Sequence, residues 1–505
     1  MPVSVVDTAS GTVQGTVEDG VTLFKGIPYA APPVGDLRFR PPQPAAPWPG
    51  TLDATAFGPA SLQNASPLEQ MLGAAQLETS EDCLTLNIWT PAADGAKRPV
   101  MVWIHGGAFV TGTGSTPWYD GTSFARTHDV VLVTINYRLG ALGFLHLDDI
   151  GGESFGGSGN LGILDQVAAL EWVRDNIAAF GGDAGNVTAF GESAGAMSVG
   201  TLLGLPAAKG LFVKAIPQSG AAHSGRTPEV ANRITAAMFE ELGLPQTHAG
   251  AEQLRSVDTD KLLAAQAAVS LKFASAGLGF TPVVDGVVLP ERPIDAIGGG
   301  NAQGVSVLIG SNQDEWRLFT MMDPTLAQLD EAKLRHRVAA VVGNDDQANA
   351  VVDVYKASRP NATAGELWTD IQGDHIFRIP AIRLAERQSA LGNPVHMYLF
   401  TWPTPVMGGA LGSCHALEIP FVFNTLGQPG AHMFTGPQDD GLRGLAATMH
   451  QAWATFARTG TPAADGMPDW PTYTADNRAT MRFDLTPEIV DDPAGTDRAA
   501  WEGIL

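Results

Sequence analysis

The sequence predicts an α/β fold on one large, mostly parallel sheet, and three observations lead to this prediction. Apolar runs rich in β-branched residues alternate along the chain with segments of helical periodicity, as strands and helices do around a parallel sheet. The strand-like runs are apolar at nearly every position, which is typical of strands buried on both faces. With 505 residues, 44% of them hydrophobic and 16% charged, the chain has enough apolar side chains for a large core.

The predicted core elements follow one another in this alternation. Strands are expected at 98–107 and 129–138, a helix at 162–182, a strand at 185–192 and a helix at 193–205. In the first helix, apolar residues recur at helical spacing from Ile163 to Ile177, and two glycines end the segment. Later elements are strands at 304–311 and 394–402 and a long amphipathic helix at 441–460.

Three other segments surround this core. Residues 28–49 contain eight prolines, which predicts extended chain wrapped over a surface. The Ala-rich, helix-prone segments 221–300 and 316–390 are expected to be insertions that cover the active-site face. Because no internal repeat and no linker divides the chain, we expect residues 1–505 to form a single domain.

Charge and composition exclude several classes of function. The chain has 30 basic and 53 acidic residues and a net charge of −23, so we expect neither a nucleic-acid nor a membrane partner. No apolar run is long enough for a membrane span, and the N-terminus lacks the pattern of a signal peptide. Cys83 and Cys414 are too few cysteines for a disulfide scaffold, and a cytoplasmic protein is therefore expected.

Residues 188–198, TAFGESAGAMS, place Ser193 between two glycines where a predicted strand meets a predicted helix. At such a sharp turn the glycines remove side chains that would clash, and the serine hydroxyl is exposed above the sheet. The helix N-terminus directs free N–H groups and positive potential to the same place. The alternative is a serine that only caps the helix. We interpret Ser193 as the candidate nucleophile.

A serine hydroxyl needs a base to take its proton and an acid to orient that base, here in the chain order Ser, acid, His. Eight histidines follow Ser193, so order alone does not select one. His415 lies in the loop-like stretch GSCHALEIPFVF (412–423) after a predicted strand, where a base is expected. Asp314 and Glu315 both follow another predicted strand, and only one of them can face His415.

Backbone N–H groups for an oxyanion site are expected where the stretch WIHGGAF (103–109) ends a predicted strand. Its glycines allow the chain to turn so that the N–H groups of Gly107 and Ala108 aim at one point. The N–H of Ala194, directly after the candidate nucleophile, is expected to join them. A plain glycine turn is the alternative.

Several longer stretches match one family. They are FKGIPYAAPPVGDLRFRPP (24–42), EDCLTLNIW (81–89), VWIHGGAF (102–109), NYRLGALGF (136–144), GNLGILDQ (159–166), FGGDAGNVTAFGESAGA (180–196), QSG (218–220), NQDE (312–315) and HALEIPFVF (415–423). Together they resemble the type-B carboxylesterases, which are α/β-hydrolases and include bacterial para-nitrobenzyl esterases, liver carboxylesterases and cholinesterases. The resemblance spans nearly the whole chain and implies an α/β-hydrolase fold.

The resemblance also implies roles for single residues. It implies Glu315 as the acid and His415 as the base, with Glu192 as the family's acidic residue beside the nucleophile. It implies that Ser219 and Glu418 belong to a supporting polar network under the histidine. Two buried, structural ion pairs are implied as well, Arg38–Glu81 and Arg138–Asp165.

The sequence departs from the family pattern in three places. The oxyanion loop reads GGA where many members read GGG, but Ala108 keeps its N–H. Trp316 follows the acid where glycine is usual, and we expect it to reshape the wall behind Glu315. Cys83 matches a cysteine that closes a disulfide loop in secreted members, yet residues 50–82 contain no cysteine.

The residues and the resemblance predict a carboxylic ester hydrolase that acts on a small-molecule ester through an acyl-enzyme intermediate. No metal is implied, because HALE (415–418) has no second metal-binding motif beside it. No cofactor is implied, because GSGNLG (157–162) has no strand before it. A hydrolase of carbamate or amide bonds is the alternative, and a non-catalytic adhesion relative is disfavoured because the whole triad is present. The oligomeric state is left open.

The sequence says less about the substrate. Residues 58–82 contain no aromatic residue, whereas cholinesterases carry there a tryptophan that holds a quaternary ammonium. The small residues of ASAGLG (274–279) predict an open acyl side, bordered by Ala276 and Leu278. We therefore expect broad acceptance of bulky or aromatic neutral esters.

Overall fold

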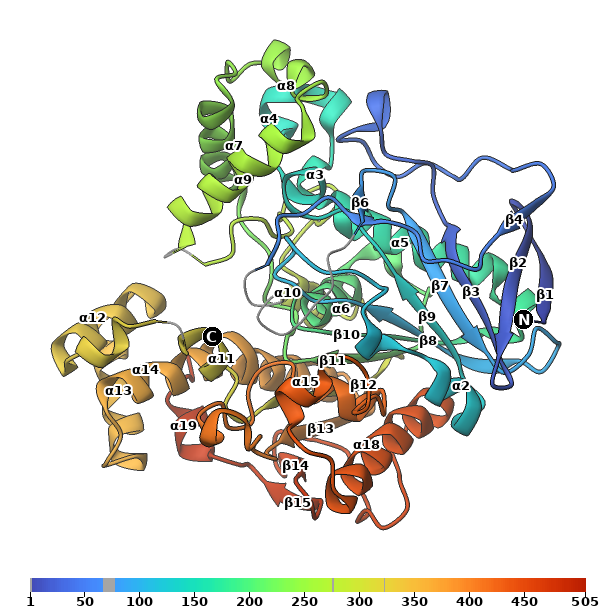
Figure 1. The fold of residues 1–505 in the computed structure, drawn as a ribbon. Helices are drawn as coiled ribbons and strands as arrows, with labels where there is room; N and C mark the ends of the chain where they lie inside the picture. Colours follow the sequence, from blue (N-terminus) through green and yellow to red (C-terminus); the bar gives the residue numbers. More distant parts are fainter. Residues whose placement is uncertain (1, 67–77, 275–276, 322) are drawn as a thin grey trace.

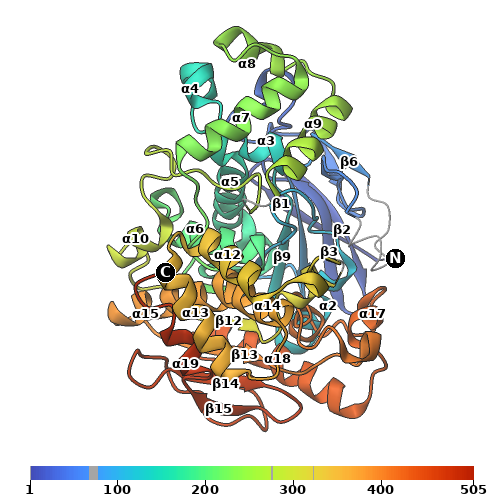
Figure 2. The same ribbon diagram turned by 90° about the vertical axis from the view of Figure 1, so that its left-hand side faces the viewer.

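A computed structural model of the chain describes residues 2–66, 78–274, 277–321 and 323–505. Its centre is a 13-stranded sheet with helices on both sides (Figures 1 and 2). The strand order is β1-β2-β3-β7-β9-β8-β10-β11-β12-β13-β14-β15, and β4 pairs with β2 outside this path. The non-consecutive neighbours are the crossovers expected of an α/β fold.

The middle of the sheet is parallel. Its strands are β8 (Arg98–Ile104), β9 (Val131–Ile135), β10 (Gly182–Glu192), β11 (Lys214–Gln218), β12 (Ser306–Asn312), β13 (Val395–Phe400) and β14 (Ala479–Phe483). Each of these neighbours pairs in parallel, and β8, β9 and β13 are buried along their whole length. This confirms the prediction made from their unbroken apolar runs.

The edges of the sheet are antiparallel. They are formed by β1 (Val3–Thr8), β2 (Gly11–Glu18), β3 (Val21–Pro28) and β7 (Thr85–Thr90) on one side and by β15 (Glu488–Asp491) on the other. None of these strands was among the elements predicted from the sequence. The five-residue strand β11 was not predicted either.

Side chains that alternate along each strand enter two separate cores. On β8, Val100 and Val102 belong to one core and Met101 and Trp103 to the other. The first core packs against α5 (Leu161–Asn176), α6 (Ala194–Gly204) and α15 (Ile379–Ala390). The second packs against α2 (Thr122–His128), α16 (Ile419–Val422) and α18 (Asp440–Thr459). Each of the predicted core helices is present within a few residues of its expected bounds.

Helices fill both segments that were expected to be insertions. The first holds α7 (Pro228–Leu242), α8 (His248–Leu254), α9 (Thr259–Lys272) and α10 (Pro293–Gly298). The second holds α11 (Arg317–Thr320), α12 (Glu331–Val342), α13 (Asp345–Ser358), α14 (Ala364–Gly373) and a π-helix at Asp374–Arg378. Helices α7–α9 and α12–α14 project away from the N-terminal strands (Figure 1). The division into one domain with two insertions stays a prediction.

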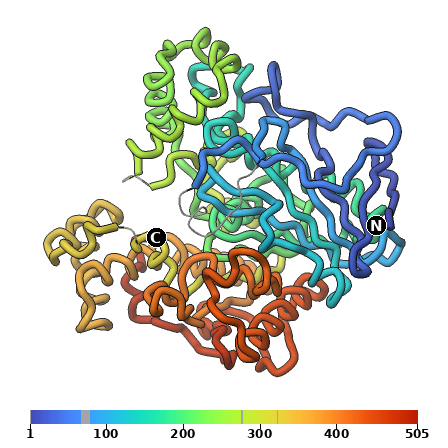
Figure 3. The backbone as a smooth tube through the Cα atoms, in the orientation of Figure 1, coloured from blue at the N-terminus to red at the C-terminus, as the bar shows by residue number. Residues whose placement is uncertain are grey.

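The implied ion pairs are both present. Arg38 Nη2 lies 2.6 Å from Glu81 Oε1, and Arg138 Nη2 lies 2.6 Å from Asp165 Oδ1. Cys83 and Cys414 are buried free thiols. In the described part of the chain, no helix is both long and apolar enough to cross a membrane. The two termini lie on opposite sides of the molecule, and the C-terminal segment folds back against α15, where Arg383 donates to the Leu505 carbonyl (Figure 3).

Candidate active site

Ser193 lies in the sharp turn between β10 and α6, with backbone angles φ 57° and ψ −124°. A residue with a side chain rarely adopts such a positive φ, so surrounding contacts must hold it. Its N–H donates to the Gln218 carbonyl at 2.9 Å, and its carbonyl accepts from the Met197 N–H at 2.8 Å. A Cβ on Gly191 would lie 2.5 Å from the Ile104 carbonyl oxygen, so this neighbour of the turn has to be glycine. The turn has the geometry that presents a serine hydroxyl above a sheet.

Glu315, and not Asp314, contacts His415. The Nδ1 atom of His415 lies 2.6 Å from Glu315 Oε2, and the other oxygen of Glu315 accepts the Asn312 N–H at 2.7 Å. Asp314 instead accepts the Ser413 N–H at 2.8 Å and pairs with Arg317 at 2.8 Å. Of the two carboxylates that the residues alone left open, the structure brings Glu315 to His415.

A second carboxylate lies on the other side of the imidazole. His415 Nε2 is 3.0 Å from Glu192 Oε1, although the two groups are not aligned for a hydrogen bond. Burial by itself would lower the pKa of His415, but the carboxylates of Glu192 and Glu315 raise it well above its usual value. Burial raises the pKa of Glu192, and the nearby His415 opposes this rise. Within the described residues, the Ser193 hydroxyl makes no hydrogen bond to His415.

Glu418 lies beneath this pair in a fully buried polar network. Its oxygens accept from Asn312 Nδ2 at 2.7 Å and from Gln218 Nε2 at 3.2 Å. Burial, with Glu192 and Glu315 nearby, raises the pKa of Glu418 to about 8. Ser219 is buried and its N–H donates to the Gly310 carbonyl at 2.9 Å. Its hydroxyl has no hydrogen-bond partner among the described residues, so its supporting role stays a prediction.

The expected oxyanion loop follows β8 directly. Gly107 and Ala108 have positive φ angles of 111° and 55°, so the chain turns sharply here. A Cβ on Gly106 would lie 3.1 Å from the Ser193 Cβ, which places the loop against the candidate nucleophile. Ala194 is the first residue of α6, and the first N–H groups of a helix have no acceptor within the helix. The role of these amides as an oxyanion site stays a prediction.

Two aromatic rings pack on His415 and a third packs on both of them, an arrangement that the sequence did not predict. The imidazole centroid lies 4.6 Å from the Phe377 ring and 5.2 Å from the Phe319 ring. Trp316 packs on Phe319 at 4.6 Å and on Phe377 at 6.1 Å. We call Trp316, Phe319 and Phe377 the aromatic cluster. Trp316 had been noted as a departure, but nothing in the local sequence points from Phe377 to His415.

Other expected site residues are less informative. Ala276 lies outside the described residues, and Leu278 is exposed with no contact to the candidate triad among the described interactions. Cys414, beside His415, is buried, and burial raises the pKa of its thiol. The described residues contain no group of three or more His, Cys, Asp or Glu that could hold a metal ion.

Comparisons with known proteins agree with this geometry. A family model described as "Carboxylesterase family" matches residues 2–501. The chain is 42% identical to the para-nitrobenzyl esterase of Bacillus subtilis (strain 168), with 98% of this chain and 97% of the relative covered. It is 38% identical to the phenmedipham hydrolase of Pseudarthrobacter oxydans, with 98% of each covered. The solved structure of carboxylesterase EST55 of Geobacillus stearothermophilus superposes with a TM-score of 0.90 at 46% identity, over 98% of this chain and 99% of that one.

Proposed function

This chain belongs to the carboxylesterase family and hydrolyses carboxylic esters on an α/β-hydrolase fold, and we propose that Ser193, His415 and Glu315 are its nucleophile, base and acid. One observation carries this proposal above the others. The Nδ1 atom of His415 lies 2.6 Å from the buried Glu315 carboxylate, at the end of the sheet where the turn presents Ser193. The alternative of carbamate or amide hydrolysis is not favoured by the comparisons.

The contact with Glu315 determines which nitrogen of His415 can act as a base. A carboxylate only accepts hydrogen bonds, so neutral His415 carries its proton on Nδ1 and donates it to Glu315. The lone pair of Nε2 is then free to accept the Ser193 proton. The Asn312 N–H in turn donates to Glu315 and holds its carboxylate in place. A backbone group therefore helps to fix the tautomer of His415.

In the proposed reaction, Ser193 Oγ attacks the ester carbonyl carbon while His415 Nε2 takes its proton. The N–H groups of Gly107, Ala108 and Ala194 bind the negative oxygen of the tetrahedral intermediate, and each such donor is worth about 3 kcal/mol. The imidazolium then gives the proton to the leaving alkoxide, and the acyl group stays on Ser193. A water molecule repeats the sequence, which releases the carboxylic acid and restores the serine.

His415 has to change its contact before it can react. In the free enzyme its Nε2 faces Glu192 rather than the Ser193 hydroxyl. Catalytic hydrogen bonds are often long in free enzymes and tighten when substrate binds, and we propose that the imidazole turns toward Ser193 at that stage. The Glu192 carboxylate stabilises imidazolium in the free enzyme, and loss of that proton must precede attack.

The substrates that we propose are bulky or aromatic neutral esters. Phe319 supports this choice, because its ring is 41% exposed beside His415 and offers an apolar surface next to the reacting groups. The relative from Bacillus subtilis is named a para-nitrobenzyl esterase, which agrees with an aromatic alcohol group. Values of kcat/KM on matched ester, carbamate and anilide substrates test this choice, and we expect the ester to be preferred.

We also propose a cytoplasmic location and no nucleic-acid partner. Both cysteines are buried free thiols, as expected in a reducing compartment, and the net charge is −23. Cell fractionation with a periplasmic marker tests the location.

Single and double substitutions test the triad. Ser193→Ala and His415→Ala should each remove ester turnover, and the double variant should lose no more than either one, because the two residues act as a unit. Independent, additive losses would contradict the shared proton transfer.

A further inference from the structure

The aromatic cluster packs directly on the imidazole that is proposed as the base. Phe377 and Phe319 contact His415 at 4.6 and 5.2 Å, and their own rings are nearly parallel at 6.4 Å. Trp316 contacts both phenylalanines and directly follows Glu315 in the chain. The cluster thus links the acid and the base of the proposed triad by packing as well as by the hydrogen bond.

The two halves of the cluster come from separate segments that lie against each other. Gly373, the last residue of α14, has no side chain, and a Cβ there would lie 3.6 Å from Glu315 Cβ and 3.7 Å from the Trp316 nitrogen. The π-helix that follows carries Phe377 toward His415. Single π-turns interrupt α-helices often at functional sites, because they redirect side chains.

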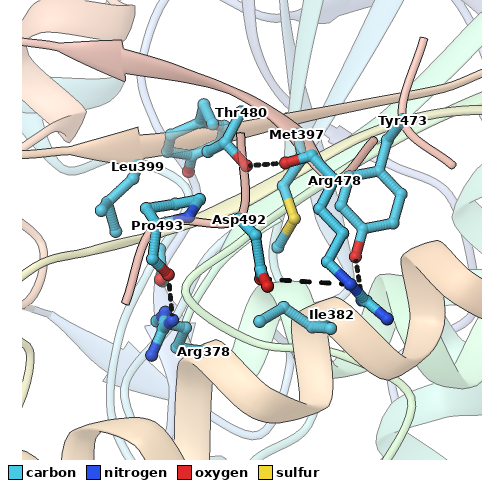
Figure 4. Close-up of a pocket in the computed structure, with 11 residues that line it drawn as sticks. Arg378, Ile382, Met397, Leu399, Tyr473, Arg478, Thr480, Asp492 and Pro493 are labelled. Carbon is cyan, nitrogen blue, oxygen red and sulfur yellow. Dashed lines mark hydrogen bonds and ion pairs between the residues drawn. The ribbon is translucent and has the colours of Figure 1, made fainter. Parts of the chain in front are cut away.

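The other side of this π-helix is anchored to the C-terminal part of the chain. Arg378 Nη1 donates to Asp374 at 3.1 Å, and its Nη2 donates to the Ala494 carbonyl at 3.2 Å. His375 stacks on Trp501 at 5.6 Å. Arg378 also lines a small pocket between α15 and the sheet, where Figure 4 shows it bonded to the Pro493 carbonyl. These contacts hold the π-helix, and with it Phe377, in place. Phe319 is exposed instead, and its closest ring neighbour is Trp316.

The imidazole needs this restraint because it has two competing acceptors. Its Nδ1 stays on Glu315, but its Nε2 lies 3.0 Å from Glu192 and must turn to Ser193 for reaction. Rings packed on the imidazole limit the orientations that it can take between these two groups. Without Trp316, Phe319 would be held mainly by its contact with His415. The Phe319 ring and the imidazole would then both be freer to move.

We propose that Trp316 is a positioning residue, which acts through Phe319 and Phe377 to confine the imidazole of His415 to a narrow range of orientations between Glu192 and Ser193. This inference rests on the proposed function, because it takes His415 as the base. Trp316 does not take part in the chemistry. A misplacement of about 1 Å at a reacting group reduces rates by up to about a hundredfold, so the effect should appear in kcat.

The test compares Trp316→Leu with Trp316→Phe and with Trp48→Leu as a matched control. Trp48 is also half-buried, but it packs near the N-terminal edge of the sheet, where its ring N–H donates to the Thr12 carbonyl. Active sites are counted in each protein with a sulfonyl fluoride, and kcat, KM and the pH profile of kcat/KM are measured per reactive site. Trp316→Met replaces Trp316→Leu if the latter does not fold.

Trp316→Leu is expected to lower kcat by about ten- to a hundredfold with KM nearly unchanged. The acid limb of kcat/KM should move to lower pH, because a looser imidazole spends less time at the 3.0 Å contact with Glu192, which stabilises its proton. Trp316→Phe keeps a ring and should restore most of kcat. Trp48→Leu should keep kcat and the pH profile of the wild type.

Three results would overturn the inference. Equal kcat and pH profiles in Trp316→Leu and Trp48→Leu would give Trp316 only a structural role. A rise in KM with kcat unchanged would make it a substrate contact. No recovery in Trp316→Phe would exclude an effect of ring packing. Failure of the proposed function looks different, since the wild-type protein itself would then not react with the sulfonyl fluoride.

Discussion

Replacing Glu315 by glutamine should leave His415 in contact but in the wrong tautomer. In the wild type, the Asn312 N–H donates at 2.7 Å to Glu315 Oε1, and Oε2 lies 2.6 Å from His415 Nδ1. A glutamine in this place must turn its carbonyl oxygen to the Asn312 N–H, because two donors cannot face each other. Its NH₂ group then points at Nδ1, and the imidazole has to carry its proton on Nε2, where it cannot accept from Ser193.

The expected loss of kcat is large, although the substitution replaces only one carboxylate oxygen by an NH₂ group. The same tautomer error in a serine-protease triad lowers kcat about 10⁴-fold, which is about 5 kcal/mol of transition-state free energy. Asp314→Asn is the matched control. Asp314 pairs with the exposed Arg317, and such pairs are worth about 0–1 kcal/mol, so kcat should stay close to the wild-type value.

The assay is kcat on one activated ester, with protein concentration corrected by active-site titration and folding checked by thermal unfolding. If Glu315→Gln keeps more than about a tenth of kcat, which corresponds to under about 1.4 kcal/mol, the tautomer argument is wrong. If Asp314→Asn is the more damaged variant, the wrong carboxylate has been assigned.

Three further predictions follow from the site. The acid limb of kcat/KM should lie above the ordinary histidine value of about 6.5, because neighbouring carboxylates raise the pKa of His415. Glu192→Gln should move that limb to lower pH, and a flat profile down to about pH 4 would exclude a histidine base. Gly191→Ala should destabilise the protein by about 1–3 kcal/mol, seen as a lower Tm, because its Cβ would meet the Ile104 carbonyl at 2.5 Å, whereas Gly444→Ala on the open side of α18 should be neutral or stabilising. A choline ester and its neutral 3,3-dimethylbutyl analogue should have similar kcat/KM, and a preference for choline above about thirtyfold, or about 2 kcal/mol, would reveal a cation site.

Much of the fold and the turn that carries the proposed nucleophile could be predicted because their signals are local. Unbroken apolar runs identified the buried strands β8, β9 and β13, and the glycines around Ser193 identified the turn from β10 to α6. The strand β11 (KAIPQ) escaped notice because Lys214, Pro217 and Gln218 interrupt its apolar run.

Other parts of the site depend on contacts between distant segments. The choice of Glu315 over Asp314 follows from where the Asn312 N–H and the Arg317 side chain lie, and neighbouring residues in a turn point in different directions. Phe377 reaches His415 only because the π-helix redirects it, and no local pattern reveals such a turn. The rings beside His415 come from the segment 316–390, and not from 58–82 or 274–279, whose lack of aromatic residues suggested an open pocket.

The central claim is that Ser193 is an activated nucleophile, and covalent labelling tests it most directly. The wild-type protein is incubated with a sulfonyl fluoride, digested and mapped by mass spectrometry, while ester turnover is followed in the same sample. We predict one label per chain, on Ser193, with loss of turnover in proportion to labelling, and neither label nor turnover in Ser193→Ala. A label on another residue, or Ser193→Ala that keeps a tenth of the wild-type kcat, would contradict the account.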